Sequence, residues 1–266
     1  MSGTSIDGAD FVLTRIHHPD SVKSGTQICQ FKDMASVAFP KSLRERLMKA
    51  ASHELQVDEL SLLHFDLGRF YAQSLEKIAQ KKSWSFDLVG MHGQTVHHLG
   101  GRASLQIGEP SFLADKLGTP VVSDFRSSDV AVGGQGAPLA TAFHRIAFQH
   151  RFKGEPYAFH NLGGISNCSM VNKNGKVEKS FDTGPANILM DLLCRKYFDK
   201  TYDRDGRIAA RGEVLEDILK ASMSYTYFAK SPPKSCGREE FGMPYLNKYF
   251  SGKSRRAEDL LCTAAE

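Results

Sequence analysis

A tight glycine turn beside a β-strand occurs once in each half of this sequence, and this repetition constrains the fold more than any other feature. Residues 3–8 form a turn that leads into an expected strand at residues 9–16. Residues 156–171 read as two strands joined at Gly163 and Gly164, which is a hairpin signal. Two such units in successive halves indicate an α/β chain with a weak internal repeat.

The remaining chain alternates between the hydrophobic periods of strands and helices. Apolar residues recur at helical spacing in residues 41–52 and 57–80, whereas residues 27–34 have the character of a strand. Shorter strands are expected at residues 87–91, 103–107 and 119–123, and further helices at residues 110–117 and 139–148, the last with Pro138 at its first position.

Composition excludes several classes of protein. With 41% apolar and 24% charged residues, the chain is neither disordered nor fibrous, and no apolar run is long enough to span a membrane. The net charge is only +4 and the basic residues are scattered, so nucleic acid is not an expected partner. Five cysteines without a C-x-x-C spacing argue against a disulfide framework or a zinc cluster and favour the reducing cytoplasm.

The glycine turns also suggest a chemistry. Backbone N–H groups and short hydroxyls in a tight turn form a nest that holds phosphate oxygens, and both Gly3-Thr4-Ser5 and Gly163-Gly164 qualify. Either turn alone could be purely structural, whereas the pair in successive halves is more informative. No Walker A loop competes with this interpretation, because residues 252–254 (Gly-Lys-Ser) lack the glycine that should stand five residues earlier.

Asp182 is the most prominent candidate for catalysis. It opens residues 182–187 (Asp-Thr-Gly-Pro-Ala-Asn), just ahead of an expected helix with Pro185 in its first turn. In one interpretation Asp182 caps this helix by accepting backbone N–H bonds. In the other, its carboxylate lies at a cleft rim as a general base or magnesium partner, with the helix N-terminus facing an anionic substrate. The residues alone leave both interpretations open.

Other polar groups give weaker signals. Four carboxylates beside glycines or strand ends could hold Mg²⁺ through water, with solvated loop charge as the alternative: Asp7, Asp10, Asp124 and Asp129. The histidines at 92, 97 and 98 have no third ligand at a suitable spacing, so we assign no resident metal site and expect a histidine that hydrogen-bonds substrate. Residues 234–239 form a loop with two cations that suits an anionic group. Cys236 between those cations could have a lowered pKa, but no paired histidine indicates a nucleophile.

Eight segments spread over the chain match the motifs of one known family. They are MSGTSIDGAD at residues 1–10, HGQTVHH at 92–98, LQIGEPSFLA at 105–114, VVSDFRSSDVAVGGQGAPLA at 121–140, NLGGISN at 161–167, FDTGPANILMD at 181–191, YDRDGRIAARGEV at 202–214 and PPKSCGREEF at 232–241. With these motifs in the family's order, the chain resembles the 1,6-anhydro-N-acetylmuramic acid kinases, a sugar-kinase branch of the actin and hexokinase ATPase superfamily.

The resemblance implies an actin-like (ribonuclease H-like) two-domain ATPase fold, with the active site in the interdomain cleft. The first domain is expected at residues 1–150 and an incomplete second domain at residues 151–266, with a linker near residues 149–156. ATP is the implied cofactor, together with Mg²⁺. The resemblance assigns ATP binding to Gly3, Thr4, Ser5, Ile6, Asp7, Gly8, Ala9, Asp10, Gly163 and Gly164.

The resemblance also implies a reaction. Asp182 would deprotonate a water molecule that attacks C1 of anhydro-N-acetylmuramic acid, while the γ-phosphoryl group of ATP captures O6, giving N-acetylmuramate 6-phosphate and ADP in cell-wall sugar recycling. Thr95, His98 and Arg126 are weaker candidates for contacts to the sugar and its lactyl carboxylate. A small anhydrosugar is therefore the expected partner, a homodimer stays open, and the expected compartment is the cytoplasm.

The chain departs from the family pattern at both ends. It begins inside the first motif, and it stops at residues 259–266, which resemble the start of a family helix. We therefore expect poor ATP affinity and turnover. A catalytically impaired remnant that binds a sugar or a partner is the alternative, as is a kinase for another anhydrosugar such as levoglucosan. Ala186 and Thr141 replace residues that are usually Gly and Pro in the family, and we expect mild effects.

Overall fold

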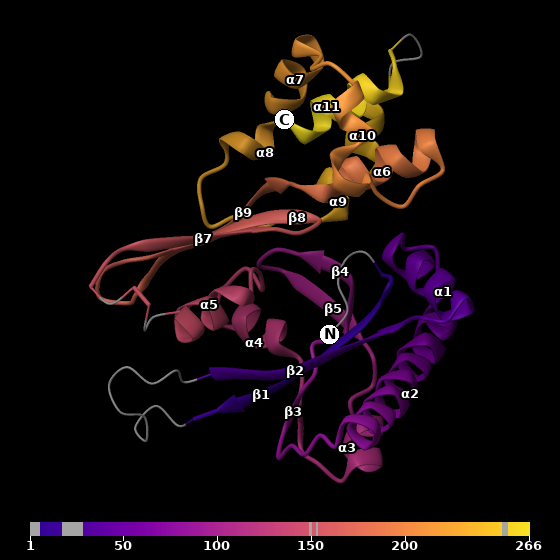
Figure 1. The fold of residues 1–266 in the computed structure, drawn as a ribbon, viewed down its shortest axis with the longest axis vertical. Coiled ribbons are helices and arrows are strands. Elements are labelled where there is room, and N and C mark those ends of the chain that lie inside the picture. The colour runs from indigo at the N-terminus through magenta and orange to yellow at the C-terminus, as the bar shows by residue number, and fades with distance from the viewer. Residues whose placement is uncertain (1–5, 18–28, 149–150, 153, 252–254) are drawn as a thin grey trace. The chain divides into compact units, whose positions relative to one another are not determined.

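The structure, a computed structural model, describes residues 6–17, 29–148, 151–152, 154–251 and 255–266 (Figure 1). Strands and helices alternate along the chain, which confirms the expected mixed α/β class. The chain divides into two compact units, one of Met1–Leu139 with Ile146–Arg151 and the other of Ala140–Arg145 with Phe152–Glu266.

The first unit begins with an antiparallel pair of strands, β1 (Gly8–Ile16) and β2 (Cys29–Ala38). Both strands were predicted, although β2 continues four residues further than expected. Side chains alternate across β1, so that Ala9 and Phe11 are buried while Asp10 and Val12 are exposed. One face of this pair therefore belongs to the core of the first unit.

Two helices supply most of that core. α1 (Lys41–Ala51) and α2 (Val57–Lys82) form where the helical periodicity predicted them. α2 begins at a capping box, in which Gln56 and Glu59 satisfy each other's backbone N–H groups. The buried stripe of α2 follows helical spacing and includes Leu63, Leu67, Tyr71 and Leu75.

Short elements complete the first unit. β3 (Val89–Gly90) pairs in parallel with β6 (Val121–Val122), and β4 (Gln94–Leu99) pairs antiparallel with β5 (Ala103–Ile107). β4 was not among the strands expected from the sequence. Two further helices are α3 (Ser111–Leu117), which was predicted, and α4 (Phe125–Ala131), which was not.

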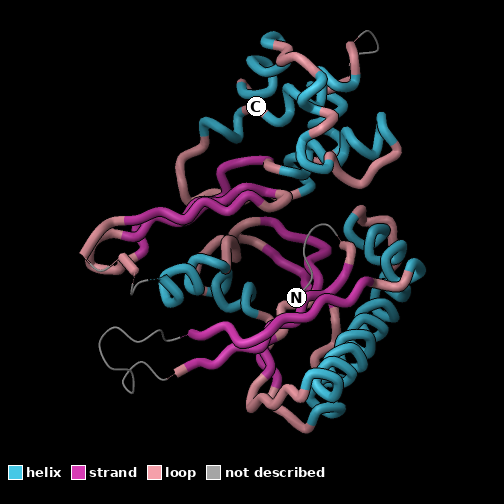
Figure 2. Tube along the Cα trace, in the orientation of Figure 1, coloured by secondary structure: helices cyan, strands magenta, loops and turns pink. Residues whose placement is uncertain are grey.

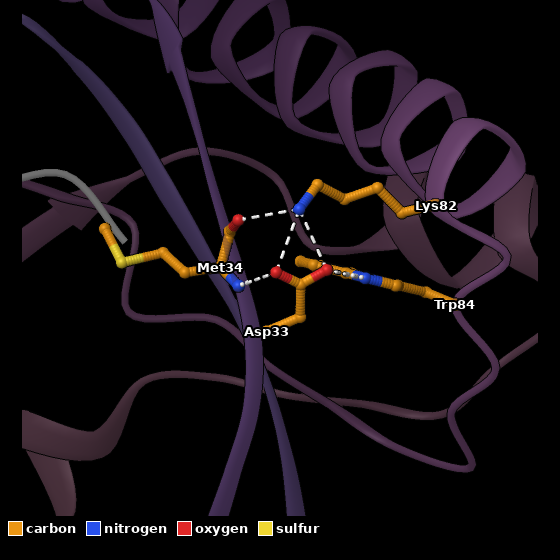
Figure 3. Close-up of polar contacts among 4 residues, drawn as sticks. All are labelled: Asp33, Met34, Lys82 and Trp84. Atoms are coloured by element: carbon orange, nitrogen blue, oxygen red, sulfur yellow. Dashed lines mark hydrogen bonds and ion pairs between the residues drawn. The ribbon is translucent and has the colours of Figure 1, made fainter.

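A carboxylate fastens β2 to the C-terminal end of α2 (Figure 3). Asp33 accepts bonds from Lys82 Nζ at 2.8 and 2.9 Å and from Trp84 Nε1 at 2.9 Å. It also accepts the N–H of Met34 at 2.7 Å. The bonds from Lys82, followed by those from Trp84 and Met34, lower the pKa of Asp33 to about 2.

The second unit contains a three-stranded antiparallel meander, drawn in magenta in Figure 2. Its strands are β7 (Tyr157–Leu162), β8 (Ile165–Val171) and β9 (Val177–Pro185). The predicted hairpin at Gly163 and Gly164 connects β7 to β8. α5 (Ala140–Phe148) contributes residues to both compact units.

A helical cluster follows the meander. Its elements are α6 (Asn187–Phe198), two 3-10 turns at Arg204–Gly206 and Ala209–Arg211, α7 (Glu216–Met223), α8 (Thr226–Ala229), α9 (Arg238–Phe241), α10 (Met243–Tyr249) and α11 (Ala257–Ala265). Its fully buried side chains include Leu193, Tyr227, Phe241, Leu246 and Leu260. They form a core separate from that of the first unit.

The structure shifts two predicted helix starts. Pro138 precedes α5, which begins at Ala140, so it does not occupy the first helical position. Pro185 is the last residue of β9, and α6 begins at Asn187. Among the helices that the structure describes, none combines the length and the hydropathy that a membrane crossing requires.

Candidate functional site

Asp182 lies within β9, five residues before α6 begins. The N-cap of α6 is Ala186 and makes no side-chain cap bond, so the structure excludes the interpretation of Asp182 as a helix cap. The residue is only 5% exposed. A buried carboxylate must have partners, because an isolated buried charge is costly.

The segment that runs along the outer edge of β9 supplies these partners. The N–H of Cys236 donates to Asp182 Oδ2 at 3.0 Å, and the N–H of Asp182 donates to Lys234 O at 3.0 Å. The hydroxyl of Tyr227 donates to the Asp182 carbonyl at 2.8 Å. Backbone and side chain of Asp182 are therefore both fixed by residues 227–236. The Cys236 N–H occupies one of the about four lone-pair sites of this carboxylate.

Glycine is required next to this aspartate. Gly184 has φ of +154°, and a Cβ there would lie 2.8 Å from Phe228 Cε1. The pairing of β8 with β9 also changes register between Ser166 and Asn167, opposite Asp182 and Gly184. Such irregularities are common beside functional sites, where they redirect a side chain.

The turn between β7 and β8 packs on the start of α6. The Gly164 carbonyl accepts from the N–H groups of Ala186 at 3.0 Å and Ile188 at 3.1 Å, and the Gly163 carbonyl accepts from that of Asn187 at 3.0 Å. These bonds use carbonyl groups, whereas a phosphate nest uses N–H groups. They also correct one expectation, since the first N–H groups of α6 bind the glycine turn rather than face a substrate.

The first glycine turn falls largely outside the described residues. Gly3, Thr4 and Ser5 belong to the undescribed part of the chain, so the structure tests nothing about them. Ile6, Asp7, Gly8, Ala9 and Asp10 are described. The Asp7 carbonyl accepts from the N–H of Phe39 at 3.0 Å, and Asp10 Oδ1 accepts from Ser36 Oγ at 2.5 Å. Both carboxylates are exposed, whereas Ile6 and Ala9 are buried.

The three weaker candidates lie in one cluster of the first unit. Gln106 Nε2 donates to Thr95 Oγ1 at 3.3 Å and to Ser104 Oγ at 2.7 Å, and Ser104 Oγ lies 3.0 Å from His98 Nδ1. Arg126 and His98 both lie beside Gly136. A Cβ added to Gly136 would lie 3.3 Å from His98 Cε1 and 3.7 Å from Arg126 Cβ. The structure thus brings Thr95, His98 and Arg126 together.

Electrostatics define what this cluster can bind. Burial, followed by the charge of Arg126, lowers the pKa of His98 to about 4, and burial also lowers that of His92. Arg126 Nε donates to His92 Nε2 at 3.1 Å and its NH1 donates to Gly136 O at 2.6 Å. Neutral imidazoles beside a guanidinium suit a ligand with hydroxyl groups and one carboxylate.

The loop at residues 234–239 differs from the expectation. Burial raises the pKa of Cys236 to about 12, so this thiol is not activated. Lys234 Nζ donates to the carbonyls of Tyr227 at 3.2 Å and Phe228 at 3.4 Å, at the end of α8. The loop therefore supports Asp182 and α8.

The described residues contain no group of three metal-ligating side chains. Mg²⁺ that arrives with a nucleotide needs only one or two carboxylates besides phosphates and water. The exposed carboxylates at Asp7 and Asp10 are of the type that such an ion uses.

The sequence analysis missed Asn167, Tyr227 and the N–H of Cys236 as neighbours of Asp182. Asn167 pairs with Asp182 across β8 and β9. The NLGGISN segment at residues 161–167 contained the only available signal, and it was interpreted through its glycines alone.

Known proteins that are similar to this chain point to one family. The family model described as anhydro-N-acetylmuramic acid kinase matches residues 1–266. A protein named anhydro-N-acetylmuramic acid kinase from Bacillus cereus (strain AH820) is 34% identical over 275 residues, which cover 99% of this chain and 70% of that protein. A protein of the same name from Bordetella pertussis (strain Tohama I) is 38% identical over 274 residues, with coverage of 99% and 69%. The match over the whole chain shows that this protein belongs to the anhydro-N-acetylmuramic acid kinase family.

Proposed function

We propose that this chain opens the 1,6-anhydro bridge of anhydro-N-acetylmuramic acid with water and phosphorylates O6 from ATP, giving N-acetylmuramate 6-phosphate and ADP. Family membership supports the kinase activity and the substrate class. The observation that carries the chemistry is Asp182, a buried carboxylate fixed by the Cys236 N–H in the same unit as the glycine turn.

Asp182 acts as the general base in this proposal. It removes a proton from the water that attacks C1, and a base held in place by backbone bonds is already oriented for this step. The turn at Gly163 and Gly164 binds phosphate oxygens of ATP through its N–H groups, as do residues 3–10 in the first unit. An actin-like arrangement of the two units would bring these parts to one site.

Mg²⁺ offsets the negative charge of the transferring phosphoryl group when it is bound with ATP. Asp7 and Asp10 would hold its water ligands. The five cysteines are free, which supports a reducing cytoplasm as the compartment.

The test is sugar-dependent release of ADP. Purified chain is incubated with anhydro-N-acetylmuramic acid, ATP and Mg²⁺, and the product is identified by its mass as N-acetylmuramate 6-phosphate. Sugar binding without ADP release would instead support the impaired remnant. Faster turnover of levoglucosan would favour a kinase for another anhydrosugar.

Asp182→Asn tests the base. Asparagine keeps the size of the side chain and an acceptor for the Cys236 N–H, so the fold should persist while kcat falls about a thousand-fold. Asp217→Asn is the matched control, because Asp217 is exposed on α7 in the same unit and pairs with Arg255 at 2.9 Å. An unchanged kcat in Asp182→Asn would refute the assignment.

Arg126 binds the lactyl carboxylate in this proposal, supported by its position between neutral histidines. Arg126→Lys keeps the charge but loses the planar two-pronged donor, so KM for anhydro-N-acetylmuramic acid should rise about tenfold. Levoglucosan lacks the lactyl group, so its KM should stay constant. Arg102→Lys, at an exposed position of the same unit, is the control.

A further inference from the structure

Asn167 has a buried side-chain oxygen that the fold does not use. Its Oδ1 is inaccessible to solvent and has no hydrogen-bond partner in the part of the chain that the structure describes. Burying an amide oxygen without a partner destabilises a fold. Such a group in a native protein calls for an explanation outside the fold itself.

The register of the sheet explains where this oxygen lies. Asn167 on β8 is directly opposite Asp182 on β9. The N–H and the carbonyl of Asp182 both bond outward, to Lys234 and Tyr227. The two residues therefore form a pair without mutual backbone bonds, the type in which opposite side chains approach most closely, with Cβ atoms about 4.5–5.5 Å apart.

A hydrolytic water molecule needs two acceptors. One O–H of the water gives its proton to the base, and the other must be held so that a lone pair points at the carbon under attack. A second acceptor beside the base can do this. Asn167 Oδ1 is such an acceptor, on the residue paired with Asp182 and without a partner among the described residues.

We propose that Asn167 Oδ1 is uncovered when the sugar binds, accepts the second O–H of the water that Asp182 deprotonates, and thereby orients the attack on C1. This inference rests on the function proposed above. In the step, an O–H bond of water breaks and its proton passes to Asp182. A bond from the water oxygen to C1 forms as the C1–O6 bond breaks, and O6 takes the γ-phosphoryl group of ATP as ADP leaves.

The inference predicts that loss of the Asn167 side chain lowers activity without lowering stability. Removal of the Asn167 side chain breaks no bond within the described structure, so Asn167→Ala should unfold at the same or a slightly higher temperature than the natural chain. The same change should lower kcat about tenfold to a hundredfold, with KM for ATP and for the sugar within twofold. Asn247→Ala is the control, because Asn247 is an exposed asparagine on α10 of the same unit.

Asn167→Asp separates orientation from packing. Its carboxylate is also an acceptor, but a second negative charge opposite Asp182 disfavours ionisation of the base. The acid limb of the kcat profile should therefore move to higher pH by about one unit, and kcat above that limb should exceed that of Asn167→Ala. Burial raises the pKa of both Tyr227 and Cys236 and keeps them neutral, and the charges of Glu239 and Glu240 that act on Cys236 are the same in the natural chain and in the variant.

Three results would overturn the inference while the proposed function stands. They are a kcat within twofold of the natural value in Asn167→Ala, a change confined to KM for the sugar, and an unmoved acid limb in Asn167→Asp. Full activity in Asp182→Asn, or no sugar-dependent ADP release by the natural chain, would instead refute the proposed function and this inference with it.

Discussion

The two glycine turns of this protein are held in place by different means. Gly8 in the first unit lies in β1 against the opposite strand, where a Cβ would come within 2.5 Å of the Val37 carbonyl oxygen. Gly163 in the second unit has ordinary space, since a Cβ there would lie 3.4 Å from Ile165 O and 3.5 Å from Asn161 Nδ2. Packing therefore requires glycine at the first position and not at the second.

This difference separates two reasons for a glycine. At Gly8 the neighbouring backbone excludes any side chain, so glycine serves the fold whatever else it does. At Gly163 the described structure leaves room, so packing does not require glycine there. The phosphate contact proposed above would give this glycine its reason. A variant at Gly8 should therefore lose stability, whereas a variant at Gly163 should have a higher KM for ATP.

Gly8→Ala should give the largest loss of stability. The new methyl group meets a backbone carbonyl that cannot rotate away, so β1 and β2 must separate, and we expect the free energy of unfolding to fall by about 3 kcal/mol. Urea unfolding followed by circular dichroism measures this. Gly90→Ala is the matched control, because its Cβ would meet only Phe125 Cζ at 3.8 Å. Equal stability of the two variants would remove the contrast.

Gly163→Ala should have a smaller effect, and in a different quantity. Its backbone conformation is open to side chains, so the free energy of unfolding should stay constant or rise by up to about 1 kcal/mol. The methyl group would occupy space that a phosphate oxygen needs, so KM for ATP should rise about tenfold while KM for the sugar stays constant. A large loss of stability with an unchanged KM for ATP would show that this glycine also serves packing.

The smallest expected effect concerns the hydrogen bonds of Asp33, which connect β2 to the C-terminal end of α2. The folded pKa of Asp33 is about 2, below the ordinary value of 3.8, so its bonds stabilise the fold at higher pH and the contribution is lost as the pH falls through about 2. The difference in urea midpoint between the natural chain and Asp33→Asn should be constant above pH 4 and vanish near pH 2.

Lys82→Met provides the second arm of that test. It removes the donor that lowers the pKa of Asp33 most, so its difference from the natural chain should shrink over the same pH range. A midpoint difference that persists at pH 2 would show that these bonds are not the source of the effect.

Local sequence patterns predicted the elements that have regular hydrophobic spacing or turn residues. They failed for elements whose formation depends on contacts with distant parts of the chain. The stripe of α2 and the hairpin at Gly163 follow from periodicity and turn chemistry, and both formed as expected. β4 was missed because its histidines, glutamine and threonine are polar, although Val96 is buried within it. α4 was missed because Asp124 before it is left-handed and makes no cap bond.

The candidate site likewise contains one residue that the sequence predicts and others that only the structure brings to it. Asp182 is visible in sequence because a motif surrounds it. The bond from Cys236 joins residues 54 positions apart, and no local pattern predicts such a contact. The expectation of a lowered pKa for Cys236 was therefore wrong, since burial rather than the neighbouring cations governs this thiol. Asn167 became a candidate only through the register of β8 and β9.

The bonds around Asp182 have a consequence for directed evolution of this protein. Tyr227, which holds the Asp182 carbonyl, packs edge-on against Phe241 with ring centroids 5.2 Å apart. A substitution at Tyr227 or Phe241 can therefore shift Asp182, because the hydroxyl of Tyr227 is hydrogen-bonded to the Asp182 carbonyl. Libraries that aim at faster turnover or greater heat tolerance should therefore keep Asp182 and vary Tyr227 and Phe241 jointly rather than one at a time.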